Sequence, residues 1–180
     1  MSFELLQREK KYHGKIIDLT VDQVRYPSGN LSIREVVEHP GGTVVLCVFD
    51  NDDILLVQQY RHPFAREVIE LPAGKLDTGE DSLLCAQREL REETGYAAAQ
   101  WNKLTSIYTT PGFCNEILHI FLARNIHRHE QGQSLEEGEA SIQVKRVPIR
   151  GAIAMVEREE IVDGKSIAGI LLGARKLGIQ

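Results

Sequence analysis

Four glutamates gather in one short segment of the chain, GKLDTGEDSLLCAQRELREETGY, which spans residues 74–96. They are Glu80, Glu89, Glu92 and Glu93. Like charges three or four residues apart on a helix destabilise it by roughly a few tenths of a kcal/mol per pair. The whole chain has a formal net charge of only −5, so its composition does not force such crowding. The segment is therefore either a solvated helix face or a binding site for a positive group.

Residues 81–94 of this segment have the periodicity of a helix. On that helix Glu89, Glu92 and Glu93 fall within an arc of about 100°, beside the apolar stripe that contains Leu90. Three carboxylates at the edge of a core repel one another and raise one another's pKa unless a cation lies among them. Mg²⁺ and Mn²⁺ prefer oxygen ligands and bridge to the phosphates of substrates. The functional interpretation is a divalent metal site, and the alternative is a solvated face.

The same segment resembles the signature of the Nudix hydrolases. That signature runs glycine, five residues, glutamate, seven residues, Arg-Glu, an aliphatic residue, any residue, Glu-Glu, any residue, glycine and an apolar residue. The matching residues of this chain are Gly74, Glu80, Arg88, Glu89, Leu90, Glu92, Glu93 and Gly95. Tyr96 stands at the last position, where an aliphatic residue is usual. So many fixed residues at the correct spacing favour the metal site over the solvated face.

The resemblance implies a fold of the α/β class, the Nudix α/β/α sandwich with a mixed sheet. It also implies that Glu89 and Glu93 are the principal metal ligands. Glu92 is expected to assist them in metal binding and catalysis, and the carbonyl oxygen of Ala73 is expected to be a backbone ligand. The expected cofactor is Mg²⁺, with Mn²⁺ as an alternative. Such an ion neutralises the charge of a diphosphate, so that water can attack it.

Four residues of the motif have structural roles in the family that this chain resembles. They are Gly74, Glu80, Arg88 and Gly95. The resemblance implies that Arg88 and Glu80 pair with each other and so fix the loop of the motif to its helix.

Two features outside the motif resemble the ADP-ribose pyrophosphatase branch of the family. Pro111 lies in TTPGFCNE (109–116), fifteen residues after Tyr96, and this branch has a proline at about that offset. The segment ELPAGK (70–75) is also typical of the branch. An ordinary Pro-Gly turn before a strand is the alternative interpretation of Pro111.

Two arginines match positions where this branch carries phosphate-binding arginines. Arg34 lies in IREVVEHPGGTVV (33–45), and Arg61 lies in VQQYRHPF (57–64). The planar guanidinium of arginine suits phosphate oxygens. A surface salt bridge is the alternative for either residue.

An acidic stretch, SLEEGEASIQV (134–144), lies where this branch often places its catalytic glutamate. Glu139 is the first candidate for the catalytic base, Glu137 the second and Glu136 the third. The spacing does not choose among them, and a polar connecting loop is the alternative.

The elements that must position these residues follow from periodicity. Residues 15–38 alternate as two strands around the turn YPSGN, and residues 41–49 and 54–60 are β-branched runs that predict a second hairpin. Further strands are predicted at 116–126 and at 142–149, the latter at a sheet edge, and helices at about 149–160 and 166–177. We expect residues 1–39 to form an N-terminal antiparallel β arm and residues 40–180 to form the catalytic domain.

Composition limits the class of protein to which the chain can belong. With 180 residues, 42% hydrophobic and 26% charged, the chain has enough material for one substantial core. A pI near 5.7 argues against a nucleic-acid binder, and no apolar run approaches the length of a membrane span. Cys47, Cys85 and Cys114 are odd in number and widely spaced, which indicates reduced thiols and a cytoplasmic location.

These observations predict hydrolysis of the pyrophosphate bond of a nucleoside diphosphate sugar to a nucleoside monophosphate and a sugar phosphate. ADP-ribose is the first candidate. Branch members often carry a base-stacking aromatic residue where this chain has Ile16 and Ile17, so GDP-mannose or a broad range of sugar nucleotides is the alternative. A non-catalytic ligand sensor is less favoured, because sensors usually lose motif glutamates. In the family that this chain resembles, such an arm commonly crosses to the second subunit of a dimer and helps to complete the substrate pocket, so a homodimer is expected.

Overall fold

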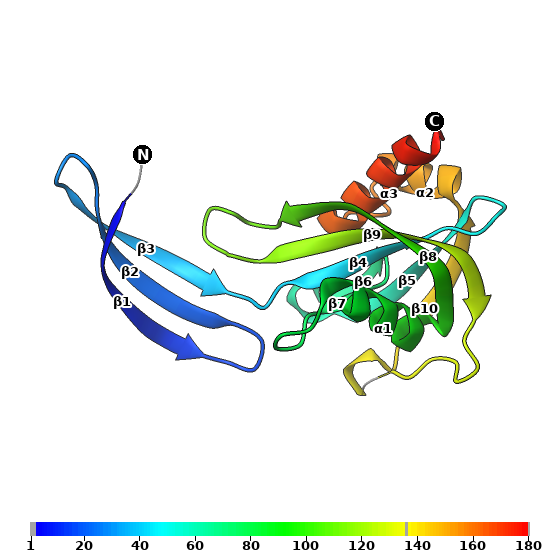
Figure 1. The fold of residues 1–180 in the computed structure, drawn as a ribbon, viewed down its shortest axis with the longest axis horizontal. Helices are drawn as coiled ribbons and strands as arrows, with labels where there is room; N and C mark the ends of the chain where they lie inside the picture. The colour runs from blue at the N-terminus through cyan, green and yellow to red at the C-terminus, as the bar shows by residue number, and fades with distance from the viewer. Residues whose placement is uncertain (1–2, 136, 180) are drawn as a thin grey trace. The chain divides into compact units, whose positions relative to one another are not determined.

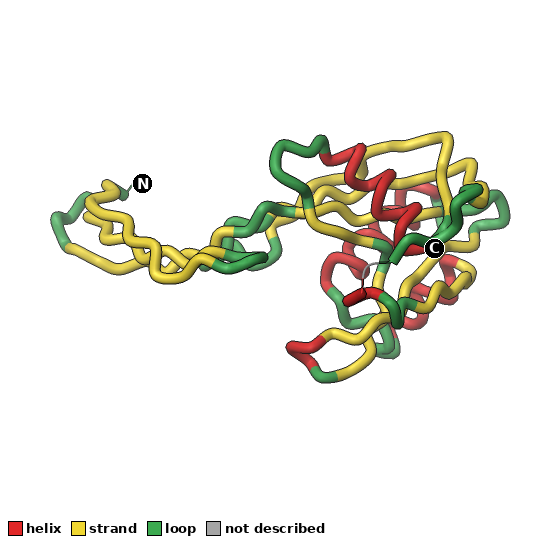
Figure 2. The backbone as a smooth tube through the Cα atoms, turned by 90° about the horizontal axis from the view of Figure 1, so that it is seen from below, coloured by secondary structure: helices red, strands yellow, loops and turns green. Residues whose placement is uncertain are grey.

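The computed structural model of the protein describes residues 3–135 and 137–179. These residues divide into two compact units, and Figure 1 shows the strands and helices of each. The first unit comprises the described residues up to Gly41 together with Tyr108–Ile117, and the second comprises Gly42–Ile107 and the residues from Leu118 onwards. Figure 2 shows that every helix of the described residues belongs to the second unit.

The first unit is an antiparallel sheet of three strands in the order β1-β2-β3. The strands are β1 (Glu4–His13), β2 (Asp18–Arg25) and β3 (Leu31–Glu38). The segment Tyr108–Ile117 joins this unit through Val37 of β3, which forms a bridge with Cys114. The two strands predicted within residues 15–38 are thus present.

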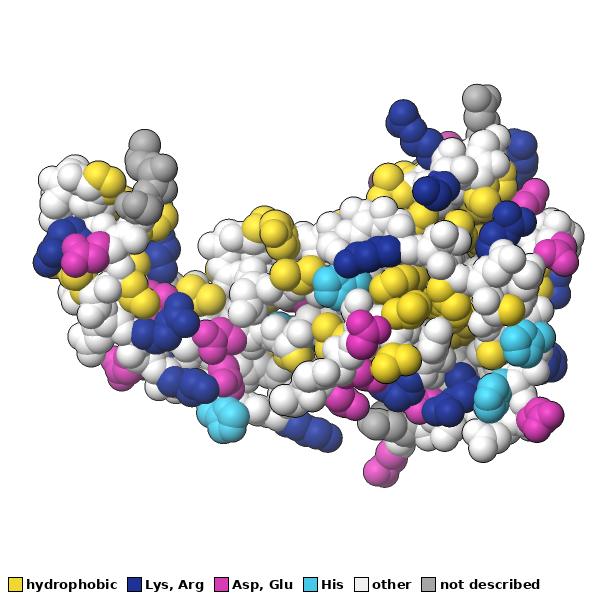
Figure 3. Space-filling view, viewed as in Figure 1, with side chains coloured by type: hydrophobic (Ala, Val, Ile, Leu, Met, Phe, Trp, Pro, Cys, Tyr) yellow, Lys and Arg dark blue, Asp and Glu magenta, His cyan; other side chains and the backbone are white. Residues whose placement is uncertain are grey.

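Strand β1 was missed by the sequence analysis, because its charged sequence ELLQREKKYH has no apolar alternation. Nine of its ten residues are exposed, so neither face needs apolar side chains. It pairs with β2 along its length, and ion pairs add to this pairing, such as the Nη2 of Arg8 at 2.7 Å from the Oδ2 of Asp22 in β2. Several hydrophobic side chains of the unit are exposed as well (Figure 3), among them Leu31 and Ile33.

The second unit contains two sheets. The first has the strand order β10-β5-β6, and the second has the order β7-β4-β9-β8. Their bounds are β4 (Gly42–Cys47), β5 (Asp53–Arg61), β6 (Arg66–Glu70), β7 (Ala73–Lys75), β8 (Tyr96–Tyr108), β9 (Ile117–Arg128) and β10 (Gln143–Pro148). Strand β4 runs parallel to β9 and antiparallel to β7, so this sheet is mixed, as expected.

Helices cover both faces of this mixed sheet. They are α1 (Ser82–Thr94), α2 (Ile149–Glu157) and α3 (Gly164–Leu177), and two short 3₁₀ turns are η1 (His62–Phe64) and η2 (Glu137–Glu139). Val44 and Leu46 pack in the core with residues of α2 and α3, whereas Val45 and Cys47 pack with Ala86 and Leu90 of α1. Alternate residues of a strand point to opposite faces, so β4 lies between the two helical layers. The α/β/α sandwich is confirmed.

The predicted hairpin of residues 41–49 and 54–60 is wrong, although both strands exist. Strand β4 pairs with β7 and β9, and β5 pairs with β6 and β10, so the two strands belong to different sheets. A tight turn does connect them, because the amide of Phe49 donates to the carbonyl of Asp53 at 2.9 Å, but the pairing continues only to a single bridge, Val48 with Ile54. Both edges of β4 are already paired, with β7 and with β9, so β5 cannot pair along it as a hairpin partner.

The other predicted elements agree with the structure at their cores. Strands β9 and β10 match the predicted segments, and β10 lies at a sheet edge as expected. Strand β8 was missed, since its sequence YAAAQWNKLTSIY is rich in alanine and polar residues. Within the described part of the chain, no helix has the length and apolar character that crossing a membrane requires.

Candidate active site

Helix α1 carries three of the four clustered glutamates, and its two ends are capped. Asp81 begins the helix, because its carboxylate accepts hydrogen bonds from the amides of Leu83 at 2.9 Å and Leu84 at 3.2 Å. Gly95 ends it with φ of 71°, a left-handed conformation that glycine adopts without the cost of a side chain. The helix therefore has fixed ends between the motif loop and β8.

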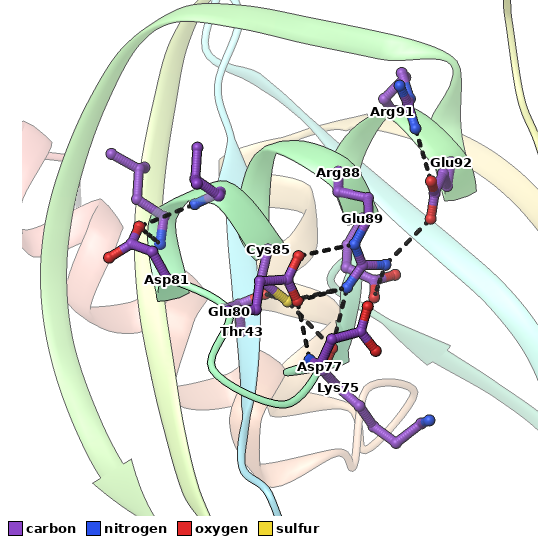
Figure 4. Close-up of polar contacts among 12 residues, drawn as sticks. Thr43, Lys75, Asp77, Glu80, Asp81, Cys85, Arg88, Glu89, Arg91 and Glu92 are labelled. Carbon is purple, nitrogen blue, oxygen red and sulfur yellow. Dashed lines mark hydrogen bonds and ion pairs between the residues drawn. The ribbon is translucent and has the colours of Figure 1, made fainter.

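Arg88 connects this helix to the motif loop (Figure 4). Its Nε and Nη2 donate to the two carboxylate oxygens of Glu80, each at 3.0 Å, and Nη2 also donates to the carbonyl of Lys75 at 3.2 Å. Its Nη1 donates to Glu89 at 2.7 Å and to Glu92 at 3.2 Å. The hydrogen bonds from Arg88 lower the pKa of Glu80 to about 2. The structure thus brings Arg88 and Glu80 together across the loop.

Glu89 lies directly against the backbone of β7. A Cβ atom added at Gly74 would stand 1.9 Å from the Cδ of Glu89 and 2.0 Å from its Oε1. A side chain at this position would therefore force the carboxylate of Glu89 to move from where it lies. Burial raises the pKa of Glu89 to about 7; the charge of Arg88 opposes this rise and the charge of Glu139 adds to it.

Glu93 contacts the same strand one residue earlier. Its Oε2 accepts a hydrogen bond from the amide of Ala73 at 3.0 Å, and the residue is only 2% exposed. Burial raises the pKa of Glu93 to about 8, and the charges of Glu89 and Glu139 contribute to the rise. Two buried carboxyl groups therefore lie side by side on β7, where ionising both without a cation is unfavourable.

Glu92, the assisting ligand in the sequence analysis, is placed differently. Its two oxygens accept hydrogen bonds from Arg88 at 3.2 Å and from Arg91 at 2.7 Å. In residues 3–135 and 137–179, no group of three or more His, Cys, Asp or Glu side chains is arranged to hold a metal ion. The pair Glu89 and Glu93 nevertheless fits Mg²⁺ or Mn²⁺, because both supply hard oxygen donors whose ionised form a cation would stabilise.

The acidic stretch before β10 contributes one glutamate to this region. Glu139 ends the turn η2 and is partly buried, and its negative charge acts on both Glu89 and Glu93. Glu137 begins the same turn and is exposed. Glu136 lies outside the described residues. Of the two described candidates for the base, Glu139 is the one whose charge acts on the motif carboxylates.

Of the two arginines singled out in the sequence, Arg61 belongs to this site. It ends β5, makes two hydrogen bonds to Glu70, and its positive charge acts on Glu93. Sequence reasoning assigned no role to Glu70, although it is the first residue of the segment ELPAGK. Lys165, which also contacts Glu70, was likewise assigned no role.

Arg34 and Pro111 belong to the first unit. Arg34 donates through Nη1 to the Oγ of Ser32 at 3.0 Å and through Nη2 to the hydroxyl of Tyr26, and its guanidinium lies over the rings of Phe3 and Tyr26. Pro111 lies in a turn where the amide of Phe113 donates to the carbonyl of Thr110 at 3.1 Å. Their phosphate-binding and substrate-binding roles stay predictions.

Comparison with known proteins identifies the class of this chain. The family model described as the NUDIX domain matches residues 39–167. The chain is 43% identical to an ADP-ribose pyrophosphatase of Bacillus subtilis, with 92% of this chain and 89% of the relative covered. It is 42% identical to an ADP-ribose pyrophosphatase of Mycobacterium tuberculosis, with 94% and 82% covered. A GDP-mannose pyrophosphatase of Citrobacter koseri is 32% identical, with 74% and 73% covered.

The chain therefore belongs to the Nudix family and is a Nudix hydrolase. Enzymes of this family generally depend on a divalent metal ion. A solved structure titled as that of an ADP compounds hydrolase shares the fold, with a TM-score of 0.85 at 17% sequence identity; 99% of this chain and 95% of that chain are covered.

Proposed function

We propose that this enzyme hydrolyses the pyrophosphate bond of nucleoside diphosphate sugars, with ADP-ribose as the first substrate. The observation that carries the proposal is the meeting of Glu89 and Glu93 on β7, and the charge of Glu139, which raises the pKa of both, supports it. This geometry belongs to a chain that is 43% identical to an ADP-ribose pyrophosphatase. The products are a nucleoside monophosphate and a sugar phosphate.

The proposed metal ligands are Glu89 and Glu93, with Glu92 and the carbonyl oxygen of Ala73 as the further expected ligands. Mg²⁺ is the proposed ion and Mn²⁺ the alternative, and the ion supplies charge neutralisation of the diphosphate and acidification of the attacking water. Glu92 would first have to leave its two arginine partners. Arg88 holds the loop and the helix together, so that both principal carboxylates stay on β7.

Glu139 is the proposed general base. Its role is to accept the proton of the attacking water, which requires a carboxylate within reach of the reacting phosphorus. Arg61 is proposed to bind phosphate oxygens. The hydrogen bonds to Glu70 raise the pKa of its guanidinium, so the group stays charged. Arg34 and Pro111 are proposed to be substrate-binding residues.

Residues 1–39 are proposed to form a dimerisation arm, and residues 40–180 the catalytic domain. Leu31 and Ile33 stand two residues apart on β3, so their side chains share a face, and they are 56% and 55% exposed. A second copy of the chain is the proposed partner for this face. A cytoplasmic location is also proposed, because the three cysteines of the described chain are free thiols.

Turnover of a panel of sugar nucleotides in ¹⁸O-water with Mg²⁺, with products identified by mass spectrometry, tests the function. We expect ADP-ribose to be cleaved fastest. GDP-mannose is the second candidate, favoured by the 32% identity to a GDP-mannose pyrophosphatase. The ¹⁸O label identifies which phosphorus is attacked. Turnover of nucleoside triphosphates but of no sugar nucleotide would overturn the proposal.

A further inference from the structure

Glu70, a carboxylate outside the Nudix motif, binds two positively charged side chains, those of Arg61 and Lys165. Glu70 ends β6, and its side chain is only 3% exposed. Its Oε1 accepts a hydrogen bond from the Nε of Arg61 at 2.7 Å. Its Oε2 accepts from the Nη2 of Arg61 at 2.7 Å and from the Nζ of Lys165 at 2.5 Å. Three charge-assisted hydrogen bonds therefore converge on a single buried group.

Lys165 is itself fixed by the start of α3. Its Nζ lies 2.9 Å from the Oδ2 of Asp163, and this same oxygen accepts a hydrogen bond from the amide of Ser166 at 3.0 Å. The hydroxyl of Ser166 accepts in turn from the amide of Leu71 at 2.7 Å, next to Glu70. The side chain of Lys165 is 14% exposed. The start of α3, which carries Lys165, is thus tied to the backbone directly after Glu70.

Arg61 presents two different edges. Its Nε and Nη2 face Glu70, whereas its Nη1 has no hydrogen-bond partner among residues 3–135 and 137–179. The side chain is 38% exposed, so Arg61 is partly accessible to a ligand. The strand end that carries Glu70 also leads to Glu93, because Ala73, three residues after Glu70, donates its amide to Glu93 at 3.0 Å, and the charge of Arg61 acts on Glu93.

The guanidinium of Arg61 and a divalent cation would therefore compete for the carboxylate of Glu93. A guanidinium that found no other carboxylate would pair with the nearest one, since arginine and carboxylate form strong bidentate pairs. Glu93 bound in that way would be less available to a divalent cation. Burial alone would raise the pKa of Glu70, but the hydrogen bonds and charges of Arg61 and Lys165 outweigh it and lower that pKa, so Glu70 is an ionised partner that holds Arg61.

We infer that Glu70 is a positioning residue for the metal and phosphate sites of this enzyme. It holds the guanidinium of Arg61 away from Glu93, keeps Glu93 available to a divalent cation, and leaves the outer edge of Arg61 for the phosphate oxygens of the substrate. Lys165 strengthens this arrangement by sharing the same carboxylate. The inference rests on the proposed function, in which Glu93 binds the metal ion and Arg61 binds phosphate.

The variant Glu70→Gln tests it, because glutamine keeps the volume of the side chain and loses its charge. We expect Mn²⁺ to bind the substrate-free protein roughly tenfold or more weakly, as is common when a partner of a site residue is lost. Electron paramagnetic resonance of free Mn²⁺ measures this affinity without any turnover. With the sugar nucleotide that the wild type cleaves fastest, KM and the Mg²⁺ concentration for half-maximal rate should rise more than kcat falls.

A second substitution separates positioning from a merely structural role. In the double variant Glu70→Gln/Arg61→Ala the competitor for Glu93 is gone, so the Mn²⁺ affinity should return towards that of the wild type. The matched control is Asp53→Asn, which removes a carboxylate paired with Arg146 at the opposite end of β5. Asp53→Asn should leave Mn²⁺ binding and both kinetic constants unchanged.

Two results would overturn the inference: Mn²⁺ affinity and KM of Glu70→Gln equal to those of the wild type, or a double variant that binds Mn²⁺ as weakly as Glu70→Gln. If Glu70→Gln does not unfold cooperatively on heating, Glu70→Asp decides the question. Its shortened carboxylate should weaken Mn²⁺ binding, and Arg61→Ala should restore it. Failure of the proposed function is a separate result, namely a wild type that cleaves no sugar nucleotide, because the Mn²⁺ comparison needs no substrate.

Discussion

The carboxylate of Glu89 occupies the space in which a side chain at Gly74 would begin, with its Cδ 1.9 Å from the position of a Cβ atom. The loop and the helix of the motif are therefore matched to each other at a single backbone position. This match gives a physical reason for the first glycine of the motif: β7 passes so close to Glu89 that a side chain at position 74 would displace the Glu89 carboxylate.

Gly74→Ala should accordingly displace Glu89. We expect a loss of stability of about 1–3 kcal/mol from overpacking, and a loss of turnover of ~10²-fold or more because a proposed metal ligand moves. Urea unfolding and steady-state kinetics measure the two effects. The matched control is Gly151→Ala in α2, where a Cβ would meet only the Cδ of Pro148 at 3.8 Å. This control should stabilise the protein by about 0.5–1 kcal/mol, since alanine is favoured in a helix interior. A fully active Gly74→Ala would contradict the geometry.

Glu93→Gln should keep the fold and reduce turnover by at least ~10²-fold, because a ligand to an electrophilic metal ion is lost. Glutamine retains an oxygen that can accept the hydrogen bond from the amide of Ala73. Circular dichroism checks the fold, and kinetics at saturating Mg²⁺ check the rate. Near-normal turnover by a folded variant would remove Glu93 from the metal site.

Glu139→Gln should lower kcat more than it raises KM, since accepting a proton acts on the transition state and is worth ~10²–10⁴-fold. Glu137→Gln is the matched control from the same turn, and it should be nearly silent because Glu137 is exposed. The assignment of the base within η2 is wrong if the two variants behave the other way round.

The ion pair of Glu80 and Arg88 should make stability depend on pH in the acid range. The pKa of Glu80 falls from its ordinary 4.5 to about 2 in the folded protein, chiefly because Arg88 donates hydrogen bonds to the carboxylate. A depressed pKa contributes stability that is present above pH 4.5 and is lost as the pH falls towards 2. Glu80→Gln should therefore lose less stability than the wild type over this interval, as measured by urea unfolding. Equal slopes for both proteins would show that the pair contributes nothing.

The proposed dimer can be tested on β3. Ile33→Glu should give a monomer with little activity on sugar nucleotides, because a charge is placed on the face proposed to meet the second copy. Leu172→Glu on α3, at a residue that is 42% exposed, is the control and should leave the assembly unchanged. Light scattering at micromolar concentration gives the mass. A full-length wild type that is monomeric and fully active would refute the arm's role.

The sequence predicted the site best where spacing alone decides the structure. The motif residues lie on one helix and one tight loop, so their separation along the chain fixes their separation in space, and Arg88 does contact Glu80 and Glu89. The contact of Glu70 with Lys165 joins residues 95 positions apart, which no local pattern encodes. The hairpin expected for β4 and β5 failed for a related reason, because local alternation does not reveal that β4 takes its partners from β7 and β9.

The parallel pairing of β4 with β9 also has a consequence for synthesis of the chain. Strand β4 ends at Cys47, whereas its partner begins only at Ile117 and ends at Arg128. At the usual rate of translation, the wait between the two strands is on the order of ten seconds. Throughout that time the apolar run Val44–Val48, fully buried in the finished enzyme, lacks its parallel partner and can pair only with the short strand β7. A strand that is fully buried in the native protein is thus exposed to solvent for several seconds during synthesis. Chaperones that bind extended apolar segments can bind it in this interval.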